Sequence, residues 1–200
     1  MHVIAIAGPS GAGKTYATML VQDVLHDLKV VVLPLDAYYR DDVARGRYPG
    51  PDFDDPQMVD LALAAQHIDA LRAGTGVCRP VYDFVRQRRT EKTVEVSGEA
   101  DVVLVEGLFA LHDAALRGRC DALAFVEERE SVCLARRMQR DVKERGRTHA
   151  SVLDRLDLIN RGLDQFVLPS RAHATIVGNA PTVASGLVRA VLCDDARRAS

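Results

Sequence analysis

The sequence predicts an α/β fold in which helices flank a parallel β-sheet. Short β-branched runs alternate with longer helical patterns along the 200 residues, and these runs are apolar almost throughout. Because helices cover both faces of a parallel sheet, its strands are expected to be apolar at nearly every position. Alternation of strand and helix is typical of right-handed crossover connections. The predicted strands are residues 3–7, 30–35, 102–105, 123–126 and 175–177.

Longer helical patterns lie between these runs, and the clearest cover residues 14–28, 56–72 and 130–145. Two irregular regions interrupt the alternation. Residues 36–56 lack periodicity, and loops of this length in compact domains are usually functional. Residues 77–96 hold two strand-like pieces around segment 82–89, which predicts an inserted hairpin. We expect one domain over residues 1–200, with a hairpin at about 77–97, a lid at about 130–150 and a final helix after Asn179.

Composition and charge exclude several classes of protein. The formal net charge of -2 argues against a protein that coats nucleic acid or an anionic membrane. The chain has no run of about 18 apolar residues and no basic leader region, so we expect a soluble, cytoplasmic protein without a membrane span. The cysteines form no C-x-x-C pair, and we expect buried thiols rather than zinc ligands or disulfides at Cys78, Cys120, Cys133 and Cys193.

A glycine-rich segment at residues 8–15 matches the phosphate-binding pattern G-x-x-x-x-G-K-S/T. It follows the first predicted strand and opens the first predicted helix, as this pattern requires. Its glycines let successive backbone N–H groups point at phosphate oxygens, and the helix adds its positive N-terminal end. Lys14 is expected to reach the β- and γ-phosphates, and the Thr15 hydroxyl is expected to bind Mg²⁺. The residues expected to hold the nucleotide here are Gly8, Ser10, Gly11, Ala12, Gly13, Lys14 and Thr15.

Two acidic residues come at the ends of predicted strands. Asp36 follows the second strand, and Glu106 follows the run 102–105. Both are expected at the carboxyl edge of the sheet, where the glycine-rich segment also lies. Two carboxylates there suit a Mg²⁺ site and a base for a hydroxyl nucleophile. Each acid alone is also compatible with a helix cap or a solvated turn.

An arginine cluster occupies the predicted lid, at Arg136, Arg137, Arg140, Arg145 and Arg147. Nearby acids, among them Asp141 and Glu144, allow a simpler interpretation as a surface covered with ion pairs. Together with the phosphate-binding segment, however, the cluster favours a lid that closes over a transferring phosphate, because guanidinium groups stabilise its spreading charge.

Aromatic residues are few, and most fall in the two irregular regions: Tyr38, Tyr39, Tyr48, Phe53, Tyr82 and Phe84. Aromatic side chains in polar loops favour stacking on a planar ligand. Anchoring of a loop to the core is an equally good interpretation of each one alone.

Taken in order along the chain, these motifs resemble the uridine-cytidine kinase family, which belongs to a wider group that includes phosphoribulokinase and pantothenate kinase. The similar segments are residues 8–15, 35–39, 52–56, 80–84, 105–107, 136–147 and 166–169. They run from residue 3 to about 177. The resemblance implies a five-stranded parallel sheet, an inserted β-hairpin and an arginine-rich helical lid. It also implies ATP and Mg²⁺ as cofactors, a small-molecule acceptor and compatibility with a homo-oligomer.

The resemblance implies roles for the residues on the phosphate side. Asp36 is expected to take the proton from a ribose 5′-hydroxyl, with Lys14 and Arg140 completing the catalytic set. Asp36, Thr15 and Glu106 are expected at the metal, and Arg140 and Arg145 at the phosphates.

On the acceptor side, the resemblance implies that Asp54 and Arg137 bind the ribose 2′- and 3′-hydroxyls. The residues expected to bind the acceptor are Tyr39, Phe53, Asp54, Tyr82, Phe84, Gln87, Arg137 and Arg147. Two positions depart from the family pattern: Gln87 and Asp55 stand where histidines are usual. A glutamine amide both donates and accepts, so it could read either uracil or cytosine.

The prediction is therefore phosphorylation of uridine or cytidine at the 5′-hydroxyl. One alternative keeps the machinery and changes the acceptor to nicotinamide riboside, pantothenate or a sugar phosphate. Another is an ATP-binding regulatory module without a small acceptor, against which Asp36, Glu106 and the lid arginines argue.

Overall fold

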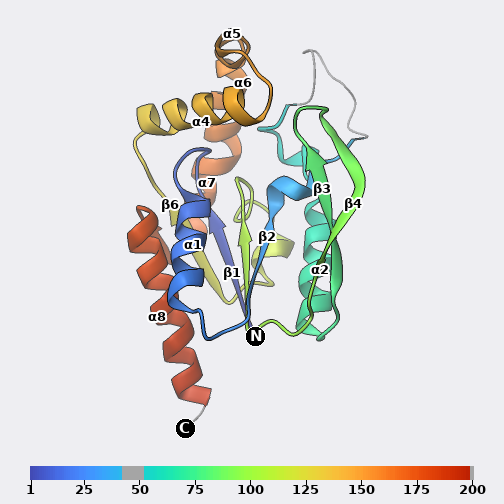
Figure 1. The fold of residues 1–200 in the computed structure, drawn as a ribbon. Coiled ribbons are helices and arrows are strands. Elements are labelled where there is room, and N and C mark those ends of the chain that lie inside the picture. Colours follow the sequence, from blue (N-terminus) through green and yellow to red (C-terminus); the bar gives the residue numbers. More distant parts are fainter. Residues whose placement is uncertain (42–51, 199–200) are drawn as a thin grey trace.

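Five parallel strands form the central sheet in the order β2-β5-β1-β6-β7 (Figure 1). A computed structural model describes residues 1–41 and 52–198 of the chain, and side chains as far as residue 193. The predicted five-stranded parallel sheet is confirmed. Its strands are β1 (His2–Ala7), β2 (Val30–Pro34), β5 (Val102–Glu106), β6 (Ala122–Val126) and β7 (Ile176–Gly178).

Strand β1 lies at the centre of the sheet and is buried along its whole length. Successive side chains of a strand point to opposite faces. Val3 and Ala5 accordingly belong to the core cluster on one face of the sheet, while Ile4 and Ile6 belong to the cluster on the other. This is the physical reason that the strand is apolar at every position.

Helices cover both faces of the sheet. α1 (Lys14–Val24) and α8 (Ala180–Arg198) pack against each other on one face, and α2 (Leu61–Arg72) lies on the opposite side (Figure 1). The short helix α3 (Ala114–Arg117) contacts α2. The final helix predicted after Asn179 is confirmed as α8.

Two helices are shorter than the sequence predicted. The helix expected over residues 14–28 ends at Val24, because the backbone of Leu25 leaves the helical conformation. The helix expected over 56–72 begins at Leu61, because the Asp60 side chain caps it by accepting from the Leu63 N–H at 3.1 Å. A separate 3₁₀ turn, Pro56–Met58, precedes it.

The inserted hairpin is confirmed as strands β3 (Val77–Asp83) and β4 (Arg88–Val96), which form a separate antiparallel sheet. The strands extend further than expected, so only residues 84–87 are left for the turn. Gln87 occupies this turn with a φ of 54°. β3 packs beside the 3₁₀ turn Leu35–Tyr38, and this contact brings the hairpin to the carboxyl edge of the sheet.

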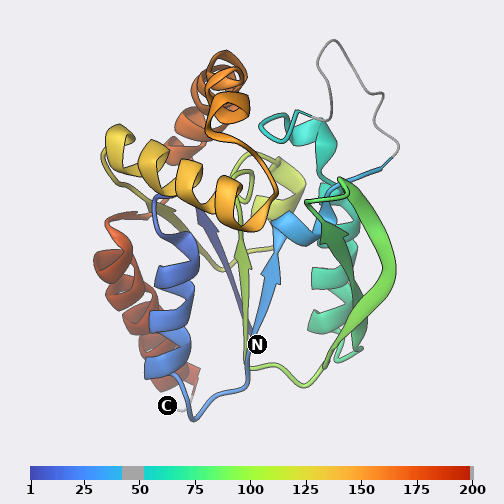
Figure 2. The same ribbon diagram turned by 45° about the horizontal axis from the view of Figure 1, so that its top comes forward.

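The lid crosses the carboxyl edge of the sheet above β1 and β5 (Figure 2). Its main helix, α4 (Glu130–Glu144), is followed by α5 (His149–Leu153) and α6 (Leu156–Gly162). A π-helical turn (Leu163–Val167), α7 (Leu168–Ser170) and a 3₁₀ turn (Arg171–His173) then lead to β7.

The cysteines differ in part from the sequence prediction. All four cysteines are free thiols, but Cys78 and Cys193 are exposed, which corrects the expectation that all would be buried. Cys78 belongs to β3 of the hairpin, and Cys193 belongs to α8. Across residues 1–41 and 52–198, none of the helices has the length and apolar character needed to span a membrane. Tyr48 falls outside the described residues.

Candidate active site

The phosphate-binding loop connects β1 to α1 and is enclosed by neighbouring backbone. A Cβ on Gly8 would lie 2.3 Å from the Val126 carbonyl oxygen, and one on Gly11 would lie 2.4 Å from the Cys133 carbonyl oxygen. Gly11 also has a φ of 87°, which side chains rarely adopt. The end of β6 and the start of α4 therefore leave room only for glycine at these two positions.

Lys14 lies across the loop that it follows. Its ammonium group donates to the carbonyl oxygens of Gly8 and Pro9, both at 2.9 Å. Burial lowers the pKa of Lys14, and the carboxylates of Glu106 and Asp36 oppose that shift. A desolvated ammonium group next to inward-facing loop backbone is suited to an anionic phosphate.

Glu106 and Asp36 leave adjacent strands at the same edge, since Pro34 pairs with Glu106 in the β2–β5 register. The Thr15 hydroxyl donates to Glu106 Oε1 at 3.2 Å. Burial raises the pKa of Glu106, and the charge of Lys14 opposes the shift. Asp36, by contrast, keeps a side chain that is 41% exposed.

These three oxygen-bearing side chains fit a Mg²⁺ ion. Mg²⁺ prefers hard oxygen ligands and usually takes only one or two carboxylates, with phosphate and water oxygens completing its octahedron. No cluster of three or more His, Cys, Asp or Glu ligands occurs among the residues that the structure describes.

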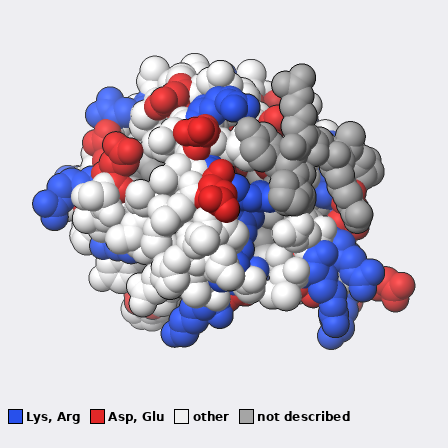
Figure 3. Space-filling view, turned by 90° about the horizontal axis from the view of Figure 1, so that it is seen from above, with Lys and Arg blue, Asp and Glu red and all other residues white. Residues whose placement is uncertain are grey.

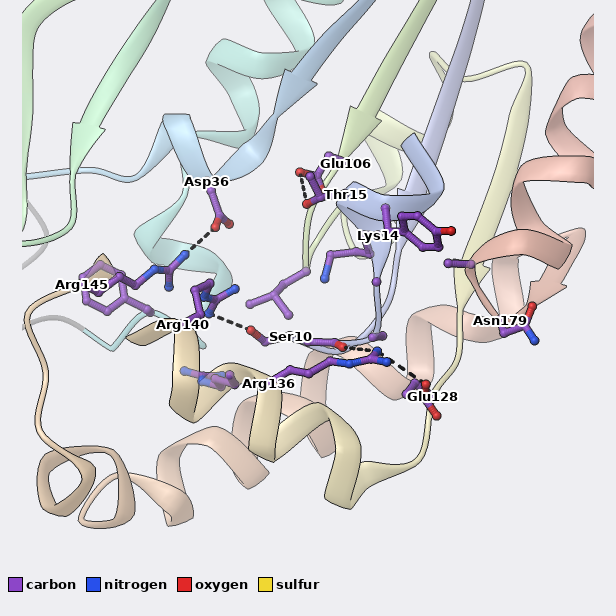
Figure 4. Close-up of a pocket in the computed structure, with 18 of the residues that line it drawn as sticks. Ser10, Lys14, Thr15, Asp36, Glu106, Glu128, Arg136, Arg140, Arg145 and Asn179 are labelled. Carbon is purple, nitrogen blue, oxygen red and sulfur yellow. Dashed lines mark hydrogen bonds and ion pairs between the residues drawn. The ribbon is translucent and has the colours of Figure 1, made fainter. Parts of the chain in front are cut away.

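The lid arginines extend from α4 and from Arg145, which follows it, toward the loop and the strand ends (Figure 4). Arg140 donates to Ser10 Oγ at 2.9 Å, and Arg136 donates to the Gly11 carbonyl at 3.2 Å. Arg145 donates to Asp36 Oδ2 at 2.8 Å. The predicted lid thus contacts both the phosphate loop and the acid expected to act as base.

Asp54 and Arg137 form a buried bidentate pair. Both guanidinium–carboxylate distances are 2.6 Å, and the two side chains are 9% and 5% exposed. Burial alone would lower the pKa of Arg137, but the charge and hydrogen bonds of Asp54 outweigh it and raise that pKa. The two residues expected to bind ribose hydroxyls therefore bind each other in this structure.

Four aromatic rings form a wall beside this pair: Tyr39, Phe53, Tyr82 and Phe84. Their centroids lie 5.0–6.0 Å apart, mostly edge to face. The guanidinium carbon of Arg145 lies 3.8 Å from the centroid of Phe84, and that of Arg147 lies 5.3 Å from Phe53. These cations rest on ring faces where a planar ligand could stack.

A cavity of about 550 Å³ joins the loop, the strand ends and the lid. Most of the predicted site residues line it: Ser10, Gly11, Ala12, Gly13, Lys14, Thr15, Asp36, Tyr39, Phe53, Glu106, Arg137, Arg140 and Arg145. Seen from above, basic side chains run along the furrow at the centre of this face (Figure 3).

Six predicted residues do not line this cavity. Gly8 lies against the backbone of Val126, and Tyr82, Phe84 and Arg147 pack against the aromatic rings that do line it. Asp54 lines a smaller neighbouring pocket with Arg137. Gln87 is exposed on the hairpin turn, so the structure does not bring it to the cavity.

Sequence reasoning missed six residues that line the cavity: Tyr16, Leu108, Glu128, Asn179, Ala180 and Pro181. Asn179 directly follows β7, and Glu128 lies two residues beyond β6. The rule that located Asp36 and Glu106 at strand ends could have found both. Sequence reasoning also missed the burial of Asp141. It treated Asp141 only as a surface ion-pair partner of the arginines, whereas the side chain is fully buried.

The family model described as Phosphoribulokinase / Uridine kinase family matches residues 3–184. The chain belongs to this family. It is accordingly a kinase, a phosphotransferase with an alcohol acceptor that uses a nucleotide. Among curated relatives, the uridine kinase of Erwinia tasmaniensis is 36% identical over 182 residues, covering 88% of this chain and 85% of that protein. The uridine kinase of Bacillus cereus is 35% identical over 178 residues, covering 88% and 84%.

Solved structures of other kinases share the fold. A putative fructose transport system kinase from Silicibacter sp. superposes with a TM-score of 0.69 at 24% identity, covering 88% of each chain. Phosphoribulokinase from Rhodobacter spheroides gives a TM-score of 0.67 at 14% identity, covering 88% of this chain and 68% of the other. At these identities the likeness concerns the fold alone.

Proposed function

We propose that this kinase transfers the γ-phosphoryl group of ATP to the 5′-hydroxyl of a pyrimidine nucleoside, uridine or cytidine. The observation that carries the proposal is the placement of Asp36 in one cavity with the phosphate loop on one side and an aromatic wall on the other. A hydroxyl acceptor between them would meet a base and a phosphoryl donor together. Curated relatives at 34–36% identity named uridine kinase support the same acceptor.

The acceptor end of the cavity has the chemistry that a nucleoside requires. Tyr39 and Phe53 line the cavity and offer ring faces for a planar base. A base that displaces the Arg147 guanidinium from Phe53 would stack on the same ring. Arg137 lines the cavity beside these two rings, and Asp54 lines the adjoining pocket. A ribose that separates this pair would find a carboxylate acceptor and guanidinium donors for two neighbouring hydroxyls. A sugar phosphate or pantothenate has no planar base for this wall.

The proposed reaction is a single in-line displacement. Asp36 accepts the proton of the 5′-hydroxyl, the hydroxyl oxygen forms a bond to the γ-phosphorus, and the bond from that phosphorus to the β–γ bridging oxygen breaks to release ADP. Lys14, Arg140 and Arg145 hold the phosphate oxygens in line and balance their charge. The proton on Asp36 then passes to solvent, to which this carboxylate is open.

Thr15, Glu106 and Asp36 are the residues that would hold Mg²⁺, which when bound neutralises charge on the β- and γ-phosphates. Glu106 must be ionised for this role. Burial raises its pKa, and the charge of Lys14 and the hydrogen bond from Thr15 limit that rise.

A coupled assay of ADP release over a panel of acceptors tests the proposal. The panel holds the common nucleosides, nicotinamide riboside, pantothenate and sugar phosphates, each with ATP and Mg²⁺. Uridine or cytidine is expected to give the highest kcat/KM, with the nucleoside 5′-monophosphate as product. A higher kcat/KM for an acceptor without a planar base would overturn it. ADP release that stays at background with every acceptor would favour a regulatory module instead.

A further inference from the structure

One buried carboxylate lies among four arginine side chains of the lid. Asp141 belongs to α4 and its side chain has no solvent-exposed surface. The buried residues of this helix are Cys133, Arg137 and Asp141, which follow one another at a spacing of four and so form one stripe. A helix normally buries apolar residues on such a stripe, and aspartate is almost never fully buried unless it is paired.

The two oxygens of this carboxylate face different arginines. Oδ1 accepts from Arg140 at 3.0 Å and lies 3.5 Å from Arg145. Oδ2 lies 3.6 Å from Arg147 and 3.7 Å from Arg137. Within the described part of the chain, Oδ2 has these ion pairs but no hydrogen bond.

The arginines at Oδ1 point to the phosphate side of the cavity. Arg140 continues to Ser10 of the phosphate loop at 2.9 Å, and Arg145, which also lies over Phe84, continues to Asp36 at 2.8 Å (Figure 4). One oxygen of Asp141 is thus connected to the donor end of the site.

The arginines at Oδ2 point to the acceptor side. Arg137 forms the bidentate pair with Asp54 at 2.6 Å, and Arg147 lies over the ring of Phe53 at 5.3 Å. The other oxygen of Asp141 is thus connected to the acceptor end. Asp141 itself does not line the cavity.

The backbone of the same residue fixes the end of the lid helix. The N–H groups of Arg145 and Arg147 both donate to the Asp141 carbonyl oxygen, at 3.2 and 3.1 Å. These bonds turn the chain back over the carboxylate. A side-chain substitution at 141 leaves them in place, so it can remove the carboxylate and keep the turn.

We propose that Asp141 is the positioning residue of the lid. Its carboxylate keeps four mutually repelling guanidinium groups converged, two toward the phosphates and two toward the acceptor, and so links the geometry of the two ends of the site. The inference rests on the proposed function in that the ends are assigned to ATP and to a nucleoside. Loss of the carboxylate leaves the four cations free to separate, which moves Arg140 and Arg145 away from the transferring phosphoryl group.

Asp141→Asn tests this role, because asparagine has the same shape and no charge. With uridine as acceptor, kcat is expected to fall about 100-fold, the size of effect that misplaced groups produce, while the variant stays folded. Glu144→Gln is the matched control: it removes the same charge from an exposed position on the same helix and is expected to leave kcat and both KM values unchanged.

A second measurement separates positioning from stability and needs no acceptor. The affinities of a non-hydrolysable ATP analogue and of ADP are measured with Mg²⁺ for each variant. Arg140 and Arg145 are placed toward the terminal phosphate, which ADP lacks. Asp141→Asn is therefore expected to lower the affinity for the ATP analogue about tenfold more than the affinity for ADP, within the range of effects typical for outer-shell partners. A general loss of structure would weaken both ligands by the same factor. If native protein fails to phosphorylate uridine and cytidine, the proposed function fails and this ratio still decides the role of Asp141.

Asp141→Glu covers the case in which the asparagine variant does not fold. Glutamate restores the charge but displaces the carboxylate by one methylene group. A stably folded glutamate variant with reduced kcat and an altered affinity ratio supports positioning. Native kcat and a native affinity ratio in either variant overturn it. If neither variant folds, Asp141 serves the fold alone, and the proposal is equally overturned.

Discussion

Arg145 donates a hydrogen bond from Nη2 to Oδ2 of Asp36 at 2.8 Å, across a separation of 109 residues. The same guanidinium lies over Phe84 and within ion-pair distance of Asp141. While this bond is made, the carboxylate proposed as the base is occupied by a lid arginine. When both substrates bind, the acceptor hydroxyl would hydrogen-bond to Asp36 and the phosphate would pair with Arg145.

The first prediction concerns Asp36. Asp36→Asn is expected to keep the fold and, measured without Mg²⁺, the affinity for an ATP analogue, since the phosphate loop is unchanged. Turnover with uridine is expected to fall by about 10²–10⁴-fold, the contribution that a general base typically makes. Steady-state ADP release and analogue binding measure the two effects. Turnover within about threefold of native would rule Asp36 out as the base, because such a change is far below that range.

The second prediction follows from the raised pKa of buried Glu106. Only the ionised carboxylate binds Mg²⁺, so metal affinity is expected to fall as the pH drops through this raised pKa. The Mg²⁺ concentration for half-maximal activity should therefore rise toward acidic pH. Glu106→Gln is expected to need more Mg²⁺ at every pH and to lose the part of this pH dependence that is due to the carboxyl group. ATP itself binds Mg²⁺ equally in both assays, so a parallel pH profile in the two proteins would contradict the assignment.

The third prediction uses two glycines of positive φ. Gly11 has a φ of 87° and no room for a Cβ, whereas Gly74 has a φ of 76° and nothing within 4 Å of one. Gly74→Ala is expected to cost only the strain of the left-handed conformation, about 1–2 kcal/mol. Gly11→Ala carries the same strain and also pushes α4 away from the loop. It is expected to lower Tm further and to abolish binding of the ATP analogue, which Gly74→Ala keeps. Equal analogue binding by the two variants would be inconsistent with this packing.

The fourth prediction concerns the thiols. Burial raises the pKa of Cys120 to about 12 and also raises the pKa of Cys133, whereas Cys78 and Cys193 are exposed. The thiolate is the reactive species, so at pH 7.5 Cys78 and Cys193 are expected to react with a maleimide within minutes. Cys120 and Cys133 are expected to react about two orders of magnitude more slowly. All four should react in denaturant. Mass spectrometry of the labelled peptides identifies the sites, and rapid labelling of Cys120 in native protein would contradict the result.

Predictions from local pattern were the most successful. The phosphate loop depends on glycines at fixed spacing between a strand and a helix, and each of these signals lies within a short window. The placement of Asp36 and Glu106 needed only one further rule, that parallel strands end at a common edge. The hairpin was located, although its turn was placed too broadly. Its strands continue through Tyr82 and from Arg88, because pairing across the hairpin overrides the polar character of that segment.

Contacts between distant segments could not be predicted from local pattern. Asp54 and Arg137 were each expected to face ribose, and nothing in the sequence indicates that they pair across 83 residues. Gln87 was expected at the base. Its place in a tight turn follows from the hairpin register, and that turn exposes its side chain. Acidic residues on a charged helix all look solvated in sequence, so burial of Asp141 could not be separated from exposure of Glu144.

The sequence by itself determined the class of fold, the phosphate loop and the acids at the strand ends, because these features arise from short-range periodicity and chain order. Only the tertiary structure decided which charges pair: Arg145 with Asp36, Arg137 with Asp54, and four arginines with Asp141. Charges on separate segments attract without regard to sequence spacing, and burial decides how strongly each attraction counts. Burial depends on how the lid, the hairpin and the sheet pack together, and that packing belongs to the folded chain as a whole.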